Sequence, residues 1–147
     1  MLARTLRTAR AAGFDPQLVF ADRQGPGDLG RRMQRAFTRA LRRHESAILI
    51  GSDCPALSGA DLRAAAQALK NGASAVLSPA EDGGYALIGL RCCCRWLFSG
   101  IDWGGPKVFA QTRARLKRLG WRWTKLRTLW DVDRPEDVLR LRRDRLL

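Results

Sequence analysis

The fold is decided by the stretch ILIGSDCP, residues 48–55. An uninterrupted apolar run ends there at an acid, Asp53, and a proline follows two residues later. Such a run is typical of a strand that is buried on both faces of a parallel sheet covered by helices. Ligands collect at the carboxyl ends of the strands in such sheets, so Asp53 is expected to meet a metal ion or a polar ligand. The alternative is a polar cap at a strand-to-helix turn set by Pro55.

A second acidic cluster, Asp131-Val132-Asp133, follows a later apolar segment. Together with Asp53 it suggests a metal-dependent site for a phosphorylated ligand, because Mg²⁺ and Mn²⁺ prefer carboxylate and water oxygens. Asp133 also stands three residues before Glu136, which is the spacing of a capping box, so it could instead cap its own helix. Asp131 could then bind the metal itself, or form a hydrogen bond to a residue that binds the metal.

Two glycine-containing segments are further candidates for ligand loops. Residues 81–85, EDGGY, predict a sharp turn whose glycines let the backbone approach a ligand closely, although a plain hairpin turn has the same composition. Residues 25–30, GPGDLG, precede an expected helix, and glycines at a helix start can cradle phosphate. The second segment matches neither a Walker loop nor GxGxxG.

Composition predicts one globular domain of 147 residues, of which 46% are hydrophobic. The sequence has no apolar run long enough for a transmembrane helix, and Met1–Gly13 lacks the continuous apolar core of a secretory signal. The four cysteines, Cys54 and Cys92–Cys94, do not have the spacing of a tetrahedral metal site. They favour a reduced, cytoplasmic chain whose thiols serve as small core residues.

The net charge of +13 is placed unevenly, because residues 51–100 carry four basic and four acidic side chains and the excess lies on either side of them. Nucleic-acid binding is one interpretation of such a balance. Between residues 29 and 43, however, the arginines lie opposite an apolar face, and the one aromatic residue of the range, Phe37, belongs to that face and not to the arginine side, where it could stack on bases. The sequence therefore favours a solvated arginine-rich surface that attracts anionic ligands.

Expected helices and strands alternate along most of the chain, which predicts a three-layer α/β/α sandwich with a mostly parallel sheet. The expected helices are Met1–Ala12, Leu29–Arg43, Ser58 (as N-cap) to Lys70, Pro106–Leu119 and Arg134–Arg145. The expected strands are Gln17–Ala21, Ala47–Gly51, Ala73–Leu77, Tyr85–Leu90 and Trp121–Leu129.

Four ordered segments carry a resemblance to a known family, and the resemblance covers about residues 17–140. They are GDLGRRM (27–33), IGSDCPAL (50–57), PAEDGGYALIGL (79–90) and WDVDRPED (130–137). The chain resembles the DUF2064 family, also called rSAM/selenodomain-associated transferase 1 proteins, which belong with the nucleotide-diphospho-sugar transferases of GT-A fold. That family begins with a strand and a basic nucleotide loop that have no counterpart here. The expected GT-A-like domain, residues 1–147, is thus incomplete at its N-terminus and has an unpaired strand edge, so that either the true start lies upstream or the chain is a truncated relative.

The resemblance also implies roles for single residues. By analogy Asp53 and Asp133 hold Mg²⁺ or Mn²⁺, which neutralises the diphosphate and stabilises the leaving group. Asp53 and Asp82 are the catalytic candidates, Asp82 by position only. The candidates for nucleotide or substrate binding are Gly27, Asp28, Gly30, Ser52, Asp82, Gly83, Gly84 and Tyr85.

The implied function is a metal-dependent glycosyl transfer from a nucleotide sugar to a small acceptor. Nucleotidyl transfer from an NTP is an alternative, because both chemistries occur on this fold. A second alternative is a non-catalytic remnant that binds a partner through its open sheet edge. The same edge makes a homodimer a further expectation, whereas neither a nucleic acid nor a membrane is an expected partner.

Overall fold

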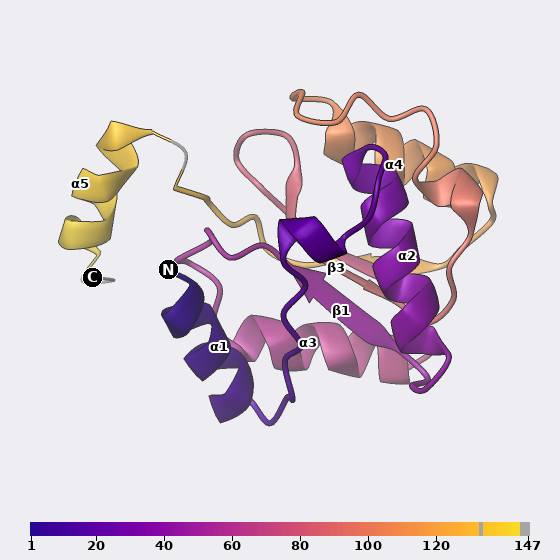
Figure 1. The fold of residues 1–147 in the computed structure, drawn as a ribbon, viewed down its shortest axis with the longest axis horizontal. Helices are drawn as coiled ribbons and strands as arrows, with labels where there is room; N and C mark the ends of the chain where they lie inside the picture. The colour runs from indigo at the N-terminus through magenta and orange to yellow at the C-terminus, as the bar shows by residue number, and fades with distance from the viewer. Residues whose placement is uncertain (133, 145–147) are drawn as a thin grey trace.

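The computed structural model describes residues 1–132 and 134–144 (Figure 1). The α-helices in these residues are α1 (Leu2–Ala11), α2 (Leu29–Leu41), α3 (Gly59–Lys70), α4 (Val108–Arg118) and α5 (Pro135–Arg143). The strands are β1 (Ala47–Ile50), β2 (Ala75–Pro79), β3 (Tyr85–Leu90) and β4 (Trp123–Lys125). Two short 3₁₀ helices, η1 (Ala21–Arg23) and η2 (Arg95–Leu97), lie in the connections.

The four strands form one sheet in the order β1-β3-β2-β4. Strand β3 is antiparallel to both of its neighbours, and β2 is parallel to β4. It follows that β1, β2 and β4 all run in one direction and that β3 alone runs in the opposite direction. The expected α/β sandwich is confirmed, and β3 is the one antiparallel strand among those described. Because Ile50 pairs with Leu87, the carboxyl end of β1 lies beside the start of β3.

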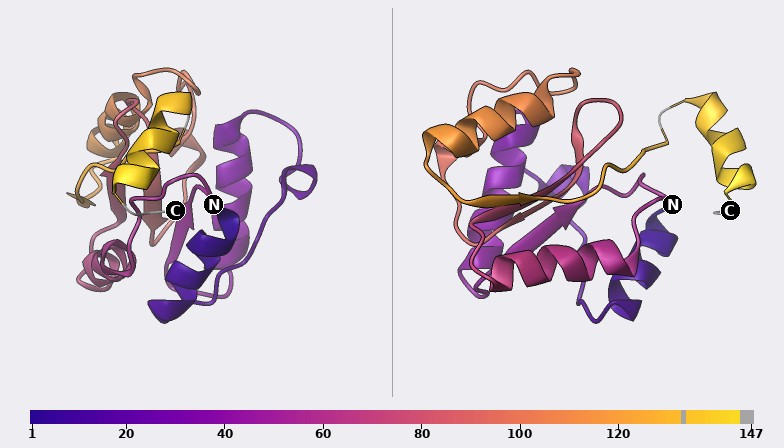
Figure 2. Two further views of the ribbon diagram at one scale, coloured as in Figure 1. Left: turned by 90° about the vertical axis from the view of Figure 1, so that its left-hand side faces the viewer. Right: turned by 180° about the vertical axis from the view of Figure 1, so that it is seen from behind.

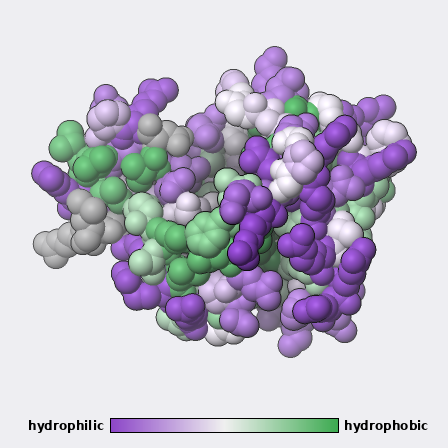
Figure 3. All heavy atoms as spheres, viewed as in Figure 1, coloured by the Kyte–Doolittle hydropathy of each residue, from purple (hydrophilic) through white to green (hydrophobic). Residues whose placement is uncertain are grey.

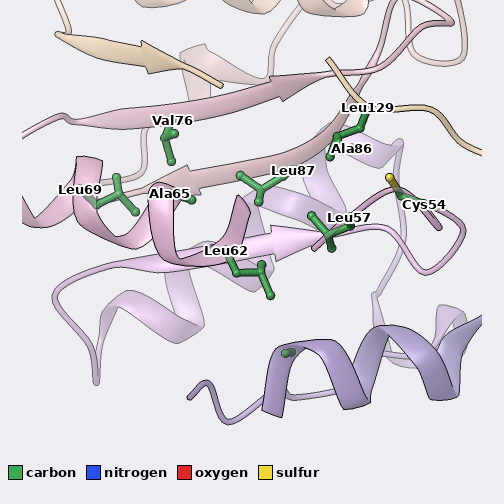
Figure 4. Packing of buried hydrophobic residues seen from close by; sticks show 10 residues of the cluster. Cys54, Leu57, Leu62, Ala65, Leu69, Val76, Ala86, Leu87 and Leu129 are labelled. Carbon is green, nitrogen blue, oxygen red and sulfur yellow. The ribbon is translucent and has the colours of Figure 1, made fainter. Parts of the chain in front are cut away.

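Helices cover both faces of the sheet, with α3 on one side and α4 on the other (Figure 2). On the α3 face, Leu62, Ala65 and Leu69 pack against Val76 and Leu87 of the sheet (Figure 4). The opposite face is closed by α2 and α4, in a cluster that includes Met33, Phe37, Leu77, Ile88 and Leu116. These two apolar layers fix the sheet that carries the loops described below.

Two expectations about strands are wrong. Residues Gln17–Ala21 form no strand, and Leu18, Val19 and Phe20 are exposed by 45%, 39% and 56%. An apolar run becomes a strand only where a neighbour satisfies its N–H and C=O groups, and the run alone does not reveal such a neighbour. Strand β1 is half-buried rather than buried on both faces, because it lies at the edge of the sheet.

The remaining expected elements agree with the structure to within a few residues, except the last strand. Only Trp123–Lys125 pairs continuously with β2, and the ladder resumes as a single bridge between Ala80 and Leu129. Figure 3 shows a mostly hydrophilic face with apolar atoms near its centre and on α5. No helix in the described part of the chain is long and apolar enough to cross a bilayer.

An ion pair between Asp61 and Arg127 joins α3 to the chain beyond β4. Ser58 and Asp61 form the capping box expected at the start of α3, and the Asp61 side chain is buried. Arg127 donates from Nε to Asp61 Oδ1 (2.7 Å), from Nη2 to Asp61 Oδ2 (2.7 Å), and from Nη2 to the Ala56 carbonyl (2.8 Å). Burial acts to raise the pKa of Asp61, but the hydrogen bonds from Arg127 and Ser58 outweigh it and hold that pKa below its ordinary value.

The turn between β2 and β3 depends on Gly83, whose φ is +92°. A Cβ at this position would lie 2.0 Å from the Pro106 carbonyl oxygen, which no real structure tolerates. The Gly83 carbonyl accepts a hydrogen bond of 2.8 Å from Phe109 N, so the turn is fastened to the first turn of α4. Glycine is therefore required here both for its φ and for the missing side chain.

We expect Gly83→Ala to destabilise the protein far more than Gly104→Ala. Gly104 also has a positive φ, +83°, but a Cβ there meets nothing within 4 Å. The free energy of unfolding of the Gly104 variant should therefore fall only by the cost of an alanine in a left-handed conformation, about 1–2 kcal/mol. In the Gly83 variant the turn must in addition move away from Pro106, which should lower the free energy of unfolding by about 2 kcal/mol more. Urea unfolding of both variants measures the difference, and equal losses would show that the contact with Pro106 does not matter.

Asp61→Asn should lower the free energy of unfolding at pH 7 by about 2–3 kcal/mol, because Arg127 loses its charged partner and α3 loses its capping carboxylate. The pKa of Asp61 is lower in the folded state than in the unfolded state, so its stabilising effect is complete above an unfolded pKa of about 4. That effect is lost as the pH falls through the folded-state pKa, and the gap to the wild type should then narrow.

Denaturant titrations at several pH values test this, with Glu45→Gln as the control. Glu45 is an exposed carboxylate in the connection between α2 and β1, and its replacement should change stability by less than about 0.5 kcal/mol. A gap between wild type and Asp61→Asn that stays constant down to strongly acidic pH would contradict the role assigned to the ion pair.

Candidate functional site

Three connections meet at the carboxyl end of β1, and we call them together the β1-end site: residues 51–54, 80–86 and 129–132. Gly51 N donates to the Ala86 carbonyl at 3.3 Å. Glu81 N donates to the Leu129 carbonyl at 3.0 Å, and Val132 N donates to the Asp53 carbonyl at 3.0 Å. Backbone hydrogen bonds thus hold three distant parts of the sequence side by side.

Asp53 is an exposed residue of this site. Its Oδ1 accepts a hydrogen bond of 3.1 Å from the Ser52 hydroxyl, while its backbone carbonyl is engaged by Val132. From the other side Thr5 of α1 donates to the Ser52 carbonyl at 3.2 Å. The backbone at residues 52–53 is therefore fixed from two directions, and the Asp53 carboxylate is left accessible to a ligand.

Cys54 turns into the core directly after Asp53. Its Sγ lies 3.4 Å from the Trp130 carbonyl oxygen, and the side chain is buried. Burial, together with the charge of nearby Asp131, raises the pKa of the Cys54 thiol to about 12. This thiol therefore stays protonated near neutral pH and does not serve as a nucleophile. Its place between Asp53 and Asp131 shows that acids from both predicted clusters lie at the same end of the sheet.

Asp133, the second predicted metal ligand, lies outside the described residues. Val132, the residue before it, donates its backbone N–H to the Asp53 carbonyl. Downstream, the N-cap position of α5 is taken by Arg134, whose N–H donates to Asp137 Oδ2 at 2.9 Å. The carboxylate that accepts a hydrogen bond from the N-cap backbone is thus Asp137 and not Glu136.

Asp82 lies exposed in the turn between β2 and β3. Its Oδ1 accepts a hydrogen bond of 2.8 Å from Gly84 N, which closes the turn locally. Beside it Glu81 forms a two-pronged ion pair with Arg140 of α5, at 2.8 and 3.1 Å. The Arg140 guanidinium also lies 4.3 Å from the centre of the Trp130 ring. Helix α5 is thereby attached to two of the three connections of the β1-end site.

Tyr85 belongs to the core rather than to the open part of the site. It packs against the apolar cluster under α2 and α4. Burial raises the pKa of the Tyr85 hydroxyl well above its ordinary value, although Thr112 of α4 lies next to it. The aromatic ring of Tyr85 therefore packs in the core directly after the turn between β2 and β3.

The glycine segment before α2 is explained by the start of that helix. Asp28 is the N-cap, and its Oδ1 accepts a hydrogen bond of 2.9 Å from Arg31 N. Gly27 has a φ of +99°. Gly30 is buried, and a Cβ there would lie 2.7 Å from Trp103 and from the Phe98 carbonyl. Helix capping and close packing account for these three residues without a ligand, and their predicted part in nucleotide binding stays a prediction.

Sequence reasoning missed Thr5, Arg127 and Arg140. Each makes a contact with a residue at least 47 positions away in the sequence, and such contacts have no characteristic spacing. In the described ranges no three or more His, Cys, Asp or Glu side chains converge as a ready metal cage.

Comparison with known proteins adds a family and a fold. Residues 2–105 match the family described as "Uncharacterized protein conserved in bacteria (DUF2064)". The structure resembles the crystal structure of a "putative nucleotide-diphospho-sugar transferase" from Desulfovibrio desulfuricans G20, with a TM-score of 0.78 and 27% sequence identity. That match covers 89% of this chain and 66% of the other, so this chain spans just under two thirds of its relative. Among curated proteins no match was found.

The family match spans well over half of the sequence and includes both Asp53 and the turn at Gly83. The structural match extends over nearly the whole chain and agrees with the sandwich described above. The chain therefore belongs to the DUF2064 family.

Proposed function

We propose that this chain carries the donor site of a metal-dependent transferase that uses a nucleotide-activated sugar. The observation that carries the proposal is the exposed Asp53 carboxylate at the carboxyl end of β1, beside the acidic segment of Asp131. Ligands of α/β sheets bind at this end of the strands. The resemblance to a protein described as a nucleotide-diphospho-sugar transferase supports the same donor class.

A magnesium or manganese ion fits the side chains of this site. Mg²⁺ keeps several waters and is held by one or two carboxylates together with substrate phosphates, rather than by a closed protein cage. One accessible carboxylate, with no cage of three ligands in the described part of the chain, matches that mode of binding. We propose Asp53 as one ligand and Asp133 as the second. When bound, the metal would neutralise the diphosphate of the leaving group.

The chain's own residues would then position the reactants. Ser52 donates to Asp53 Oδ1 and so orients the carboxylate. Asp82 is exposed while its Oδ1 closes the turn, which makes it our candidate for accepting the proton of the acceptor hydroxyl. The net charge of +13 favours the approach of an anionic donor. Transfer of the sugar to a small acceptor is the activity we infer.

The donor site can be tested by thermal unfolding with nucleotide sugars and NTPs, with and without Mg²⁺ or Mn²⁺. A donor at 100 times its Kd should add about 2.7 kcal/mol of stability, which is on the order of 5–10 °C in Tm for a chain of this size. We expect this shift with a nucleotide sugar and only when the metal is present. A metal-dependent shift with NTPs alone would replace glycosyl transfer by nucleotidyl transfer, and no shift with any nucleotide would refute the donor site.

Asp53→Asn is the matching variant, and it should abolish the metal-dependent shift while leaving the Tm of the unliganded protein within about 2 °C of the wild type. Asp15→Asn is the control, since Asp15 is an exposed acid that follows α1. It should retain the full shift. If Asp53→Asn instead lowers the unliganded Tm strongly and keeps the shift, Asp53 is a structural cap of the turn after β1.

A further inference from the structure

The three cysteines after β3 do not all serve as small core residues. Cys93 and Cys94 are half-buried, but Cys92 is exposed, so that expectation is wrong for Cys92. One exposed thiol does not by itself form a binding site. A second open surface lies along β4, at the opposite edge of the sheet from β1.

Strand β4 has β2 as its neighbour on one side and no described strand on the other. The Arg122 carbonyl accepts a hydrogen bond of 2.8 Å from Ser74 N, and Leu126 N donates one of 2.8 Å to a carbonyl of β2. Backbone groups point alternately to the two sides of a strand, so those of Trp123 and Lys125 point away from β2. This β4 edge therefore offers N–H and C=O groups to another extended chain.

A hollow lies on each side of the β4 edge. One, of about 610 Å³, lies between α3 and β4, where Gln67, Ala68 and Arg122 are among its lining residues. The other, of about 670 Å³, lies between α4 and the segment of Trp121 and Trp123. Trp123 lines both hollows, and α3 and α4 cover opposite faces of the sheet (Figure 2). Alternate side chains of a further strand paired with β4 would enter these two hollows in turn.

The chain around the β4 edge is strongly basic. Residues 103–130 contain eight basic side chains and no acidic one: Lys107, Arg113, Arg115, Lys117, Arg118, Arg122, Lys125 and Arg127. Arg113 and Lys117 are exposed on α4 and line the hollow on that side. Charges of one sign on an edge strand repel another copy of the same strand, but they attract a chain of the opposite charge.

We propose that the β4 edge binds an extended acidic segment of another protein, which adds to the sheet as a further strand. Main-chain hydrogen bonds to Trp123 and Lys125 would supply the pairing, and alternate side chains would supply the selectivity. Acidic side chains would enter the hollow beside α4 and meet Arg113 and Lys117. Small uncharged side chains would enter the hollow beside α3, which is lined mostly by alanines and amides.

The other possible occupants fit these residues less well. A second copy of the chain would bring its own Arg113 and Lys125 against the same charges. A single-stranded nucleic acid would need aromatic rings that are free to stack on bases. The Phe109 ring instead faces the Arg113 guanidinium at 5.9 Å and the Lys125 ammonium at 5.8 Å. Trp121 and Trp123 pack against the core, and Trp123 also meets Phe109 edge-on at 6.0 Å.

The test is the fluorescence anisotropy of a labelled peptide, TEVEVEVT, with both ends blocked. Its glutamates and valines alternate, so the acids can reach α4 while the valines face α3. A version that is N-methylated at its two central residues keeps every charge. It loses two consecutive N–H groups, one of which would pair with β4 whichever side of the peptide faces it. We expect the first peptide to bind, and the N-methylated peptide and the lysine counterpart TKVKVKVT to bind at least about tenfold more weakly.

The matching variant is Arg113→Glu with Lys117→Glu, which reverses two exposed charges on α4. It should weaken binding of the acidic peptide at least about tenfold, because like charges then face each other. Arg39→Glu with Arg43→Glu is the control. It makes the same change of charge at the same spacing, on exposed residues at the end of α2, which packs beside β1 at the other edge. Binding should stay within about twofold, because salt screens distant charges. Thermal unfolding of both variants shows that the fold is kept.

Five results would overturn the proposal. Wild-type protein that does not bind the acidic peptide has no such site. Equal binding of the N-methylated peptide would show that charge alone holds it, without strand pairing. An equal loss in the α2 and α4 variants would place the peptide elsewhere. Binding of oligothymidylate in place of the peptide, lost in the α4 variant, would make the surface a nucleic-acid site. A dimer in gel filtration that the α4 variant converts into a monomer would put a second copy on the edge. The assay contains no nucleotide, so its outcome does not depend on the proposed donor site.

Discussion

The interaction on which the rest of the structure depends is the ion pair between Asp61 and Arg127, together with the third hydrogen bond from Arg127 to Ala56. Strands β1 and β4 lie on opposite edges of the sheet, yet the segments that follow them meet at this ion pair and again where Cys54 contacts the Trp130 carbonyl. With Arg127 in place, the two segments continue side by side as far as the backbone hydrogen bond between Val132 and Asp53. The ion pair of Asp61, eight residues after Asp53, thus helps to hold the Asp53 loop beside the second acidic cluster.

How much of this could be predicted from the sequence depends on the range of the contacts. The capping box of Ser58 and Asp61 and the strand Tyr85–Leu90 were predictable, because both are specified by neighbouring residues. The strand expected at Gln17–Ala21 is wrong, and so is the expectation that the apolar run ILI is buried on both faces, because β1 has a partner on one side only among the described strands. Both errors concern which strands become neighbours, and that is a property of the whole sheet.

The candidate site was likewise predictable only where its residues follow a local pattern in the sequence. The rule that ligands bind at strand ends pointed to Asp53, and the structure places it beside the Asp131 segment, while its metal-binding role stays a prediction. The ion pairs made by Arg127 and Arg140 had no signal in the sequence, because any of 27 basic residues could have filled these places. Homodimer formation through the β1 edge also stays a prediction.

The inverted direction of β3 has a consequence for the order in which the chain folds. Since β2 and β3 are joined by residues 80–84 alone, the middle pair of the sheet is also its most local pair. Closing so short a loop costs little chain entropy, whereas β1 and β4 reach their partners only after much longer loops have closed. We therefore expect the hairpin around Gly83 to form first, and the two edge strands, with the acidic segments that follow them, to pair with it later.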